Sequence, residues 1–259
     1  MSEPSFADRF LSDRAFRRES LERAVENPNN DYSALRLAKY ATEQDGVPTE
    51  WDALPVSNPA VRPVTVDDPV SAANAAHVPD TPVWDGKRPD SDAEWLALGR
   101  RAFELLPVEI DDRAGTLAQD AASRAEFGMW TDERHRVAGL VHLATADGAT
   151  HVAWTCSGCH ARTDAAGRLV HGAPAVALDR GAMTPAPPDG TPPVSWGWGS
   201  GRLDVTADGI DNPTAIPDLR ALSHQSHLHW EATLVNGLPA LAVRIETLII
   251  ENAHQRFRP

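Results

Sequence analysis

The chain has 259 residues, of which 42% are hydrophobic and 24% are charged, the composition of a folded protein with a hydrophobic core. Its formal net charge of −13 argues against nucleic acid as a partner, because phosphate backbones are bound by basic patches. The same charge favours a partner protein with a basic face. The sequence contains no run of about twenty apolar residues, so no transmembrane segment is expected.

The first ninety residues are predicted to form a helical and Pro-rich extension. Apolar residues recur three to five positions apart from Phe6 to Ala24, a spacing typical of helices. A second helical run, 32–41, follows the breaker Asn27-Pro-Asn-Asn. From Asp45 to about Pro89 the sequence is Pro-rich and aperiodic, which fits either a long wrapping loop or an interdomain linker.

The remainder, 91–259, is predicted as a single haem-binding domain. Ser91 with Glu94 three positions on predicts a capped helix. The apolar segments 137–144 and 150–154 flank Asp147-Gly148 and predict a β-hairpin. A short helix is expected over 156–161. A closing helix is expected after Gly237, with Pro239 in its first turn and with helical spacing of these apolar residues: Leu238, Leu241, Ile245, Leu248 and Ile249.

The segment Cys156-Ser-Gly-Cys159-His160 matches the attachment pattern for a c-type haem. One helical turn places the two sulfurs on one face, where each can add to a haem vinyl group, and the adjoining imidazole ligates the iron. These are the only two cysteines of the chain. Random placement of two cysteines would give this spacing followed by His in about three cases in ten thousand. The sequence therefore predicts one covalent haem c held by Cys156, Cys159 and His160.

Three other interpretations of the cysteine pair are kept. A thioredoxin-type dithiol would need a βαβ unit, which the sequence does not indicate. A zinc site would have to take further ligands from His224, His227 or His229, since no other cysteine exists. A structural disulfide across two residues is strained and rare.

No hydrolase, metalloprotease or phosphate-loop motif occurs in the chain. The run Asp204 to Asp211 gathers carboxylates around Gly209, as a Ca²⁺ loop does, but its twelfth position is Ala215 and not Glu. A hydrogen-bonded Asp-Gly turn is therefore favoured over calcium binding.

These elements resemble a class I-like c-type cytochrome, whose first helix is matched by Gly99-x-x-x-Phe103. Pro217-Asp-Leu-Arg220, followed by His227-Leu-His-Trp-Glu-Ala-Thr233, is similar to a stretch of the bacterial di-haem cytochrome c peroxidases. The resemblance covers about residues 91–253. It implies a cytochrome c-like haem domain, and with it a fold that is mainly α with long irregular loops and a small β-hairpin. That superfamily carries two haem motifs and this chain has one, so a second haem would lie in another domain or subunit.

The resemblance also bears on the second iron ligand, which lies about forty to seventy residues after the first in cytochromes of this shape. His229 best matches the histidine of the similar stretch and is the favoured ligand. His227, His224 and Met183 remain alternatives, as does a vacant position. Met129 is expected to pack in the core.

Haem also needs apolar walls and cations near its propionates. Trp154, Trp196, Trp198 and Trp230 are candidates for the walls, although each fits a core or loop position equally well. Arg202 and Arg220 are candidate propionate partners, with a plain surface role as the alternative.

The sequence thus favours a mono-haem c-type cytochrome that passes single electrons to a redox partner. The enzymatic alternative is the haem-bearing part of a di-haem peroxidase-like oxidoreductase, and the third hypothesis is a zinc-stabilised binding module. Covalent haem is attached outside the cytoplasm, so we expect a periplasmic or exported protein whose leader is absent from this chain.

Overall fold

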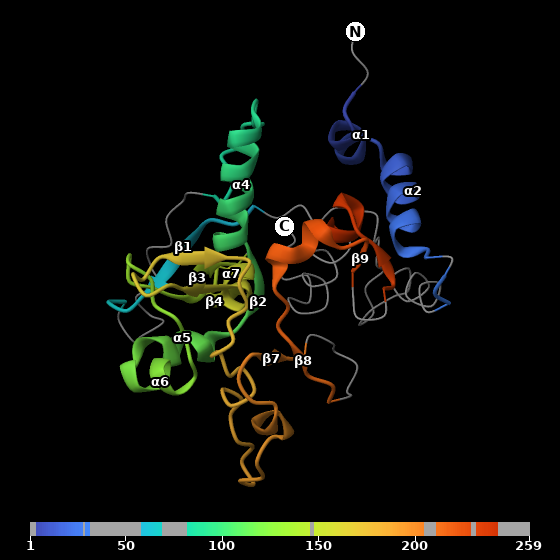
Figure 1. Cartoon of the computed structure of the whole chain (residues 1–259). Coiled ribbons are helices and arrows are strands. Elements are labelled where there is room, and N and C mark those ends of the chain that lie inside the picture. Colours follow the sequence, from blue (N-terminus) through green and yellow to red (C-terminus); the bar gives the residue numbers. More distant parts are fainter. Residues whose placement is uncertain are drawn as a thin grey trace. The chain divides into compact units, whose positions relative to one another are not determined.

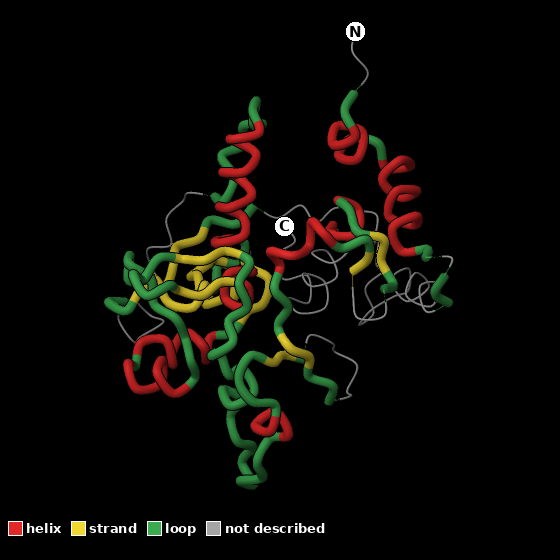
Figure 2. Tube along the Cα trace, viewed as in Figure 1, coloured by secondary structure: helices red, strands yellow, loops and turns green. Residues whose placement is uncertain are grey.

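The computed structural model describes residues 4–27, 29–31, 58–68, 82–145, 148–204, 211–228 and 232–242 (Figures 1 and 2). The chain divides into two compact units. The smaller unit comprises Met1–Val56 with Ala221–Glu251, and the larger comprises Ser57–Arg220 with Asn252–Pro259. This division groups residues by their contacts, so it does not test the predicted boundary between independently folding domains near residue 90.

The larger unit is built on a four-stranded antiparallel sheet in the order β1-β3-β4-β2, drawn in yellow in Figure 2. Its central strands are β3, Arg136–Ala144, and β4, Thr150–Thr155. They pair in a hairpin register that sets Leu140 opposite Trp154. The predicted β-hairpin is therefore confirmed, although residues 146 and 147 of its turn lie outside the described part of the chain.

The edge strands are β1, Val61–Thr65, and β2, Pro107–Ile110. Pro63 lies within β1, and a proline is tolerated there because an edge strand pairs on one side only. β1 falls inside the segment 45–89, which the sequence analysis took as aperiodic, so that interpretation was wrong for residues 61–65. The strand forms because β3 supplies its hydrogen-bond partners from about eighty residues away.

Three helices accompany the sheet: α4 (Asp92–Leu105), α5 (Asp112–Gln119) and α6 (Ala121–Glu126). The predicted cap of α4 is confirmed, since the Ser91 side chain accepts from Glu94 N and Glu94 caps in return. Asp111 and Asp120 cap α5 and α6 through their side chains, which accept from Ala114 N and Ser123 N. Figure 1 shows α4 extending from the sheet, and none of its residues is buried.

The prediction of a mainly α fold was wrong. Besides the main sheet, the described chain forms several small antiparallel sheets, with a short helix, α7 (Cys156–His160), between β4 and β5. The paired strands are β5 (Ala161–Thr163) with β6 (Leu169–His171), β7 (Arg202–Leu203) with β8 (Thr214–Ala215), and β9 (His227–Leu228) with β10 (Leu234–Val235). These strands are too short to show alternation, so local sequence gives no signal for them. The cytochrome c-like architecture expected from the resemblance was also wrong, because the described chain is built around antiparallel sheets.

Each unit has its own hydrophobic cluster. In the larger unit the side chains that pack together come from both strands of the hairpin and from the loop after β6, among them Leu140, Trp154, Leu178 and Met183. The single-turn 3-10 segment η2 (Val194–Gly197) belongs to this unit as well.

The smaller unit contains α1 (Phe6–Ser12), α2 (Arg14–Val25) and the β9–β10 pair. The 3-10 segment η3 (Leu219–His224) leads into it. Its cluster includes Phe10, Leu21, Leu228 and Leu234. The helix predicted over 6–24 is thus confirmed as two helices, and helical residues 238–242 confirm the start of the closing helix. The predicted helical run 32–41 and the closing helix beyond 242 lie outside the described residues.

Candidate functional site

The cysteine motif forms α7, which begins directly after the last residue of β4. Thr155, at the junction, donates its hydroxyl hydrogen to the Gly139 carbonyl of β3 at 2.9 Å. A hydroxyl has one hydrogen, so the 2.8 Å contact between the Thr155 and Ser157 hydroxyls must use the hydrogen of Ser157. These two buried bonds fix the start of α7 against the sheet.

Two glycines allow α7 to lie directly on the sheet. Gly139 has φ +63, and a Cβ built on it would lie 2.4 Å from Gly158 N. A Cβ on Gly158 would lie 2.6 Å from Cε3 of Trp154. Side chains at either position would push the motif helix away from β3 and β4. The Gly within Cys-Ser-Gly-Cys therefore has a packing role in this fold.

Cys156 and Cys159, predicted as the haem-binding cysteines, are both free thiols within one helical turn. Burial raises the pKa of each thiol to about 11. The charges of Arg180 and Glu109 act on Cys159 in opposite directions, Arg180 lowering and Glu109 raising its pKa. In the described fold both sulfurs are therefore protonated at neutral pH.

Beside Cys159 lies a charged cluster that sequence reasoning missed. The Arg180 guanidinium stacks 4.3 Å from the centroid of the Trp154 ring and donates from Nη2 to Glu109 Oε1 at 2.8 Å. Trp154 Nε1 donates to Asp111 Oδ2 at 2.9 Å, and that oxygen lies 3.7 Å from Arg180 Nη2. Glu109 lies on β2 and Asp111 is the N-cap residue of α5, so no strand alternation in the sequence marks the two as a pair. Nothing in the sequence points to Arg180.

His160, the predicted iron ligand, has one ring nitrogen in use. Its Nδ1 lies 3.2 Å from the carbonyl oxygen of Pro217. A carbonyl can only accept, so Nδ1 carries the hydrogen, and in the neutral ring Nε2 keeps a free lone pair. Burial lowers the pKa of His160, which favours that neutral form. A backbone carbonyl that fixes the tautomer in this way is the usual support of a metal-ligating histidine.

The residues predicted as candidates for the second iron ligand do not all belong to the same unit. His229, the favoured one, lies outside the described residues, as does Trp230. His224 and His227 belong to the smaller unit, where His227 Nδ1 contacts the Ser226 hydroxyl at 3.0 Å.

Met183 belongs to the larger unit, and its buried side chain is part of the cluster against which Cys159 packs. Met129 is buried in the same cluster, so its predicted core role is confirmed.

The aromatic candidates for the pocket lie in different settings. Trp154 is buried beneath α7, whereas Trp196 is 44% exposed and donates to the Thr184 carbonyl. Trp198 is partly buried and donates to Asp211.

The predicted propionate partners are both exposed. Arg220 is paired with Asp218 through Nε and Nη2. The residues 205–210 of the Ca²⁺ alternative lie outside the described part of the chain.

The residues present include the donor set of a c-type haem. Two thiols one turn apart and an adjacent imidazole with a free Nε2 are the donor set that covalent haem requires. Within the described ranges, no group of three or more His, Cys, Asp or Glu side chains could hold a metal ion.

No helix among the residues described is long and apolar enough to cross a membrane. Comparisons with protein-family models, with curated proteins and with solved structures found no match.

Proposed function

We propose that this chain holds one c-type haem through Cys156 and Cys159, with His160 as an iron ligand, and passes single electrons to a redox partner. The observation that carries the proposal is the bond from His160 Nδ1 to the Pro217 carbonyl. It leaves one nitrogen free for a metal and orients the ring from outside the motif.

The protein groups of the site divide the work. The two sulfurs hold the macrocycle to α7, and the glycine contacts keep α7 on the sheet. The Pro217 carbonyl holds the proton on Nδ1 of His160 and strengthens Nε2 as a donor. When bound, the haem supplies a one-electron couple, whose potential the protein sets through axial ligands and nearby charges. Arg180 and Glu109 are the described charges that act on Cys159.

Haem attachment is tested by producing the chain, with an export leader, in cells that carry a c-type maturation system. We expect the intact mass to exceed that of the polypeptide by one haem and the reduced protein to show a c-type α band. The variant with Cys156→Ala and Cys159→Ala, made in the same cells, should have the bare mass. A wild-type mass equal to that of the polypeptide would refute the proposal.

The second iron ligand, for which His229 is proposed, is tested in the haem-loaded protein. The variant His229→Ala should convert a six-coordinate, low-spin spectrum to a high-spin one, and His227→Ala and Met183→Leu should leave it unchanged. An unchanged spectrum of His229→Ala would exclude this residue and leave its neighbours or Met183 as candidates.

A further inference from the structure

Segment 171–175 starts at the last residue of β6 and returns to the motif helix. Ala175 N donates to the carbonyl oxygen of Cys159 at 2.9 Å. On the other side of His160, Ala161 of β5 pairs with His171 of β6 in an antiparallel register. The backbone before and after His160 is therefore bound to this one segment.

The same segment also holds the loop that supplies the acceptor for His160. Leu219 N donates to the Gly172 carbonyl at 2.8 Å. Leu219 lies two residues after Pro217, whose carbonyl oxygen is 3.2 Å from His160 Nδ1. Both partners of that hydrogen bond are thus anchored to segment 171–175, although they are 57 residues apart in the sequence.

Gly172 is the residue at which the segment meets this loop. Its φ of +76 lies in the left-handed region, which favours glycine. A Cβ built on it would lie 3.1 Å from Cγ of Arg220 and 3.5 Å from Arg220 N. A side chain at this position would therefore strain the backbone and also press on the loop.

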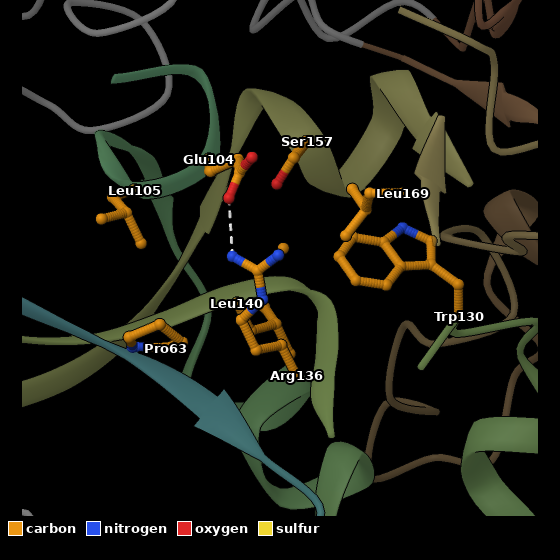
Figure 3. Close-up of a pocket in the computed structure, with 9 residues that line it drawn as sticks. Pro63, Glu104, Leu105, Trp130, Arg136, Leu140, Ser157 and Leu169 are labelled. Atoms are coloured by element: carbon orange, nitrogen blue, oxygen red, sulfur yellow. Dashed lines mark hydrogen bonds and ion pairs between the residues drawn. The ribbon is translucent and has the colours of Figure 1, made fainter. Parts of the chain in front are cut away.

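The rest of the larger unit holds segment 171–175 in turn. Ala173 and Ala175 are buried. Nε2 of His171 lies 2.6 Å from Oε1 of Glu104, whose other oxygen accepts from Arg136 at 2.6 Å. Figure 3 shows this pair of Glu104 with Arg136, which joins α4 to β3. The segment is thus held by α4 and β3 independently of the loop that it carries.

We infer that Gly172 is a positioning residue, which holds the Pro217 carbonyl against His160 and thereby keeps the hydrogen on Nδ1 and Nε2 free. The contact of 3.2 Å is at the long end of the range for N–H···O bonds, so a shift of the loop by a few tenths of an ångström weakens it. The inference rests on the proposed function only where it concerns iron, because the His160 ring has a tautomer in the haem-free chain as well.

The first test uses the full haem-free chain labelled with ¹⁵N-histidine, at a pH where the His160 ring is neutral, with its signals assigned by their loss in His160→Gln. We expect two-bond proton–nitrogen correlations of the wild type to place the hydrogen on Nδ1. In Gly172→Ala the ratio of the Nδ1–H form to the Nε2–H form should fall several-fold, because the loop is displaced. An unchanged ratio in the folded variant would overturn the inference, as would a wild-type ring with its hydrogen on Nε2.

Gly167→Ala is the matched control. Gly167 also flanks β6, has φ +77, and accepts from a distant backbone N–H, that of Glu133. A Cβ built on it meets nothing closer than 3.5 Å. The control should therefore carry the same backbone strain and leave the tautomer ratio of His160 unchanged. An equal fall in both variants would assign the effect to general strain and overturn the positioning role.

A measurement on the wild type covers the case in which Gly172→Ala does not fold. Amide hydrogen exchange at Leu219 should be slowed at least tenfold relative to the unfolded chain, because its N–H is bonded to Gly172. Exchange of Leu219 at the unfolded rate would overturn the inference without any variant.

The haem-loaded protein supplies the readout at the iron. Gly172→Ala should raise the reduction potential relative to the wild type and to Gly167→Ala, because a histidine that loses the acceptor of its Nδ1 is a weaker donor to ferric iron. An unchanged potential would overturn the role of Gly172 at the iron. A wild type that takes up no haem would refute the proposed function and leave the tautomer result standing.

Discussion

At the scale of single residues, the contact between Gly139 and Gly158 is the tightest constraint on the motif. In Gly139→Ala the new Cβ meets backbone at 2.4 Å, and φ +63 is strained for alanine. We expect a loss of about 2–4 kcal/mol in the free energy of unfolding, measured by urea denaturation. Gly99→Ala is the control, since this helical glycine has open space around it and alanine there should stabilise by about 0.5–1 kcal/mol. Equal effects of the two substitutions would contradict the packing of α7 on β3.

The thiols provide a second prediction at this scale. Burial raises the pKa of Cys156 and Cys159 from the ordinary thiol value of 9.0 to about 11. In the haem-free chain at pH 8, alkylation by iodoacetamide should therefore be about 100-fold slower than in the urea-unfolded chain, because only the thiolate reacts. Mass spectrometry of quenched samples measures both rates. Similar rates would mean that the sulfurs are open to solvent in the folded chain.

Single residues of the site could be predicted only where they form a motif whose spacing is known. Cys156, Cys159 and His160 follow from the motif itself. The acceptor for His160 is a backbone carbonyl, that of Pro217, and carbonyls are present at every residue, so the sequence cannot distinguish this one. Arg180 acts through tertiary neighbours that are distant in sequence, and no local pattern marks it.

At the scale of elements, α4, β3 and β6 are tied together by Glu104, Arg136 and His171. Burial alone would raise the pKa of Glu104, but the hydrogen bonds and charges of Arg136 and His171 outweigh it and lower the pKa below 4.5. A carboxyl group whose pKa is lower in the folded chain stabilises the fold at pH values above its pKa in the unfolded chain. This stabilisation is lost as the pH falls through the pKa of the folded chain. The network should therefore hold at neutral pH and weaken below pH 4.5.

The matching experiment compares Glu104→Gln with the wild type. At pH 7 we expect the variant to lose about 1–3 kcal/mol in the free energy of unfolding, because it leaves the partly buried Arg136 with one carboxylate. The difference between the two proteins should shrink as the pH is lowered from 5 to 3. The control Asp218→Asn breaks an exposed pair with Arg220 and should have a smaller effect. A difference independent of pH would refute the role assigned to the Glu104 charge.

Elements were predictable where their signals are local. The capping box of α4 and the β3–β4 hairpin follow from residues within a few positions of each other. β1 and β2 each contain a proline, have four or five residues, and pair with strands far away in the sequence. Their formation depends on the tertiary fold, and without them the chain looks mainly helical.

At the scale of the whole molecule, the net charge of −13 is the feature with a measurable consequence. If the proposed haem is present, reduction by a cationic ruthenium ammine should slow several-fold as ionic strength rises from about 10 to 500 mM. Reduction by an anionic reagent such as dithionite should accelerate over the same range. Stopped-flow absorbance at the haem band measures both rates. Salt dependence of the same sign for both reagents would exclude steering by the molecule's overall charge.

The burial of the two sulfurs has a consequence for the biogenesis of the protein. The motif follows the last strand of its sheet without any intervening loop, so both cysteines become partly buried as soon as that strand pairs. If the proposed haem is attached, the bulky macrocycle reaches these side chains most readily before the strand docks. Attachment and folding would then compete in time, and rapid folding would yield a stable protein without haem.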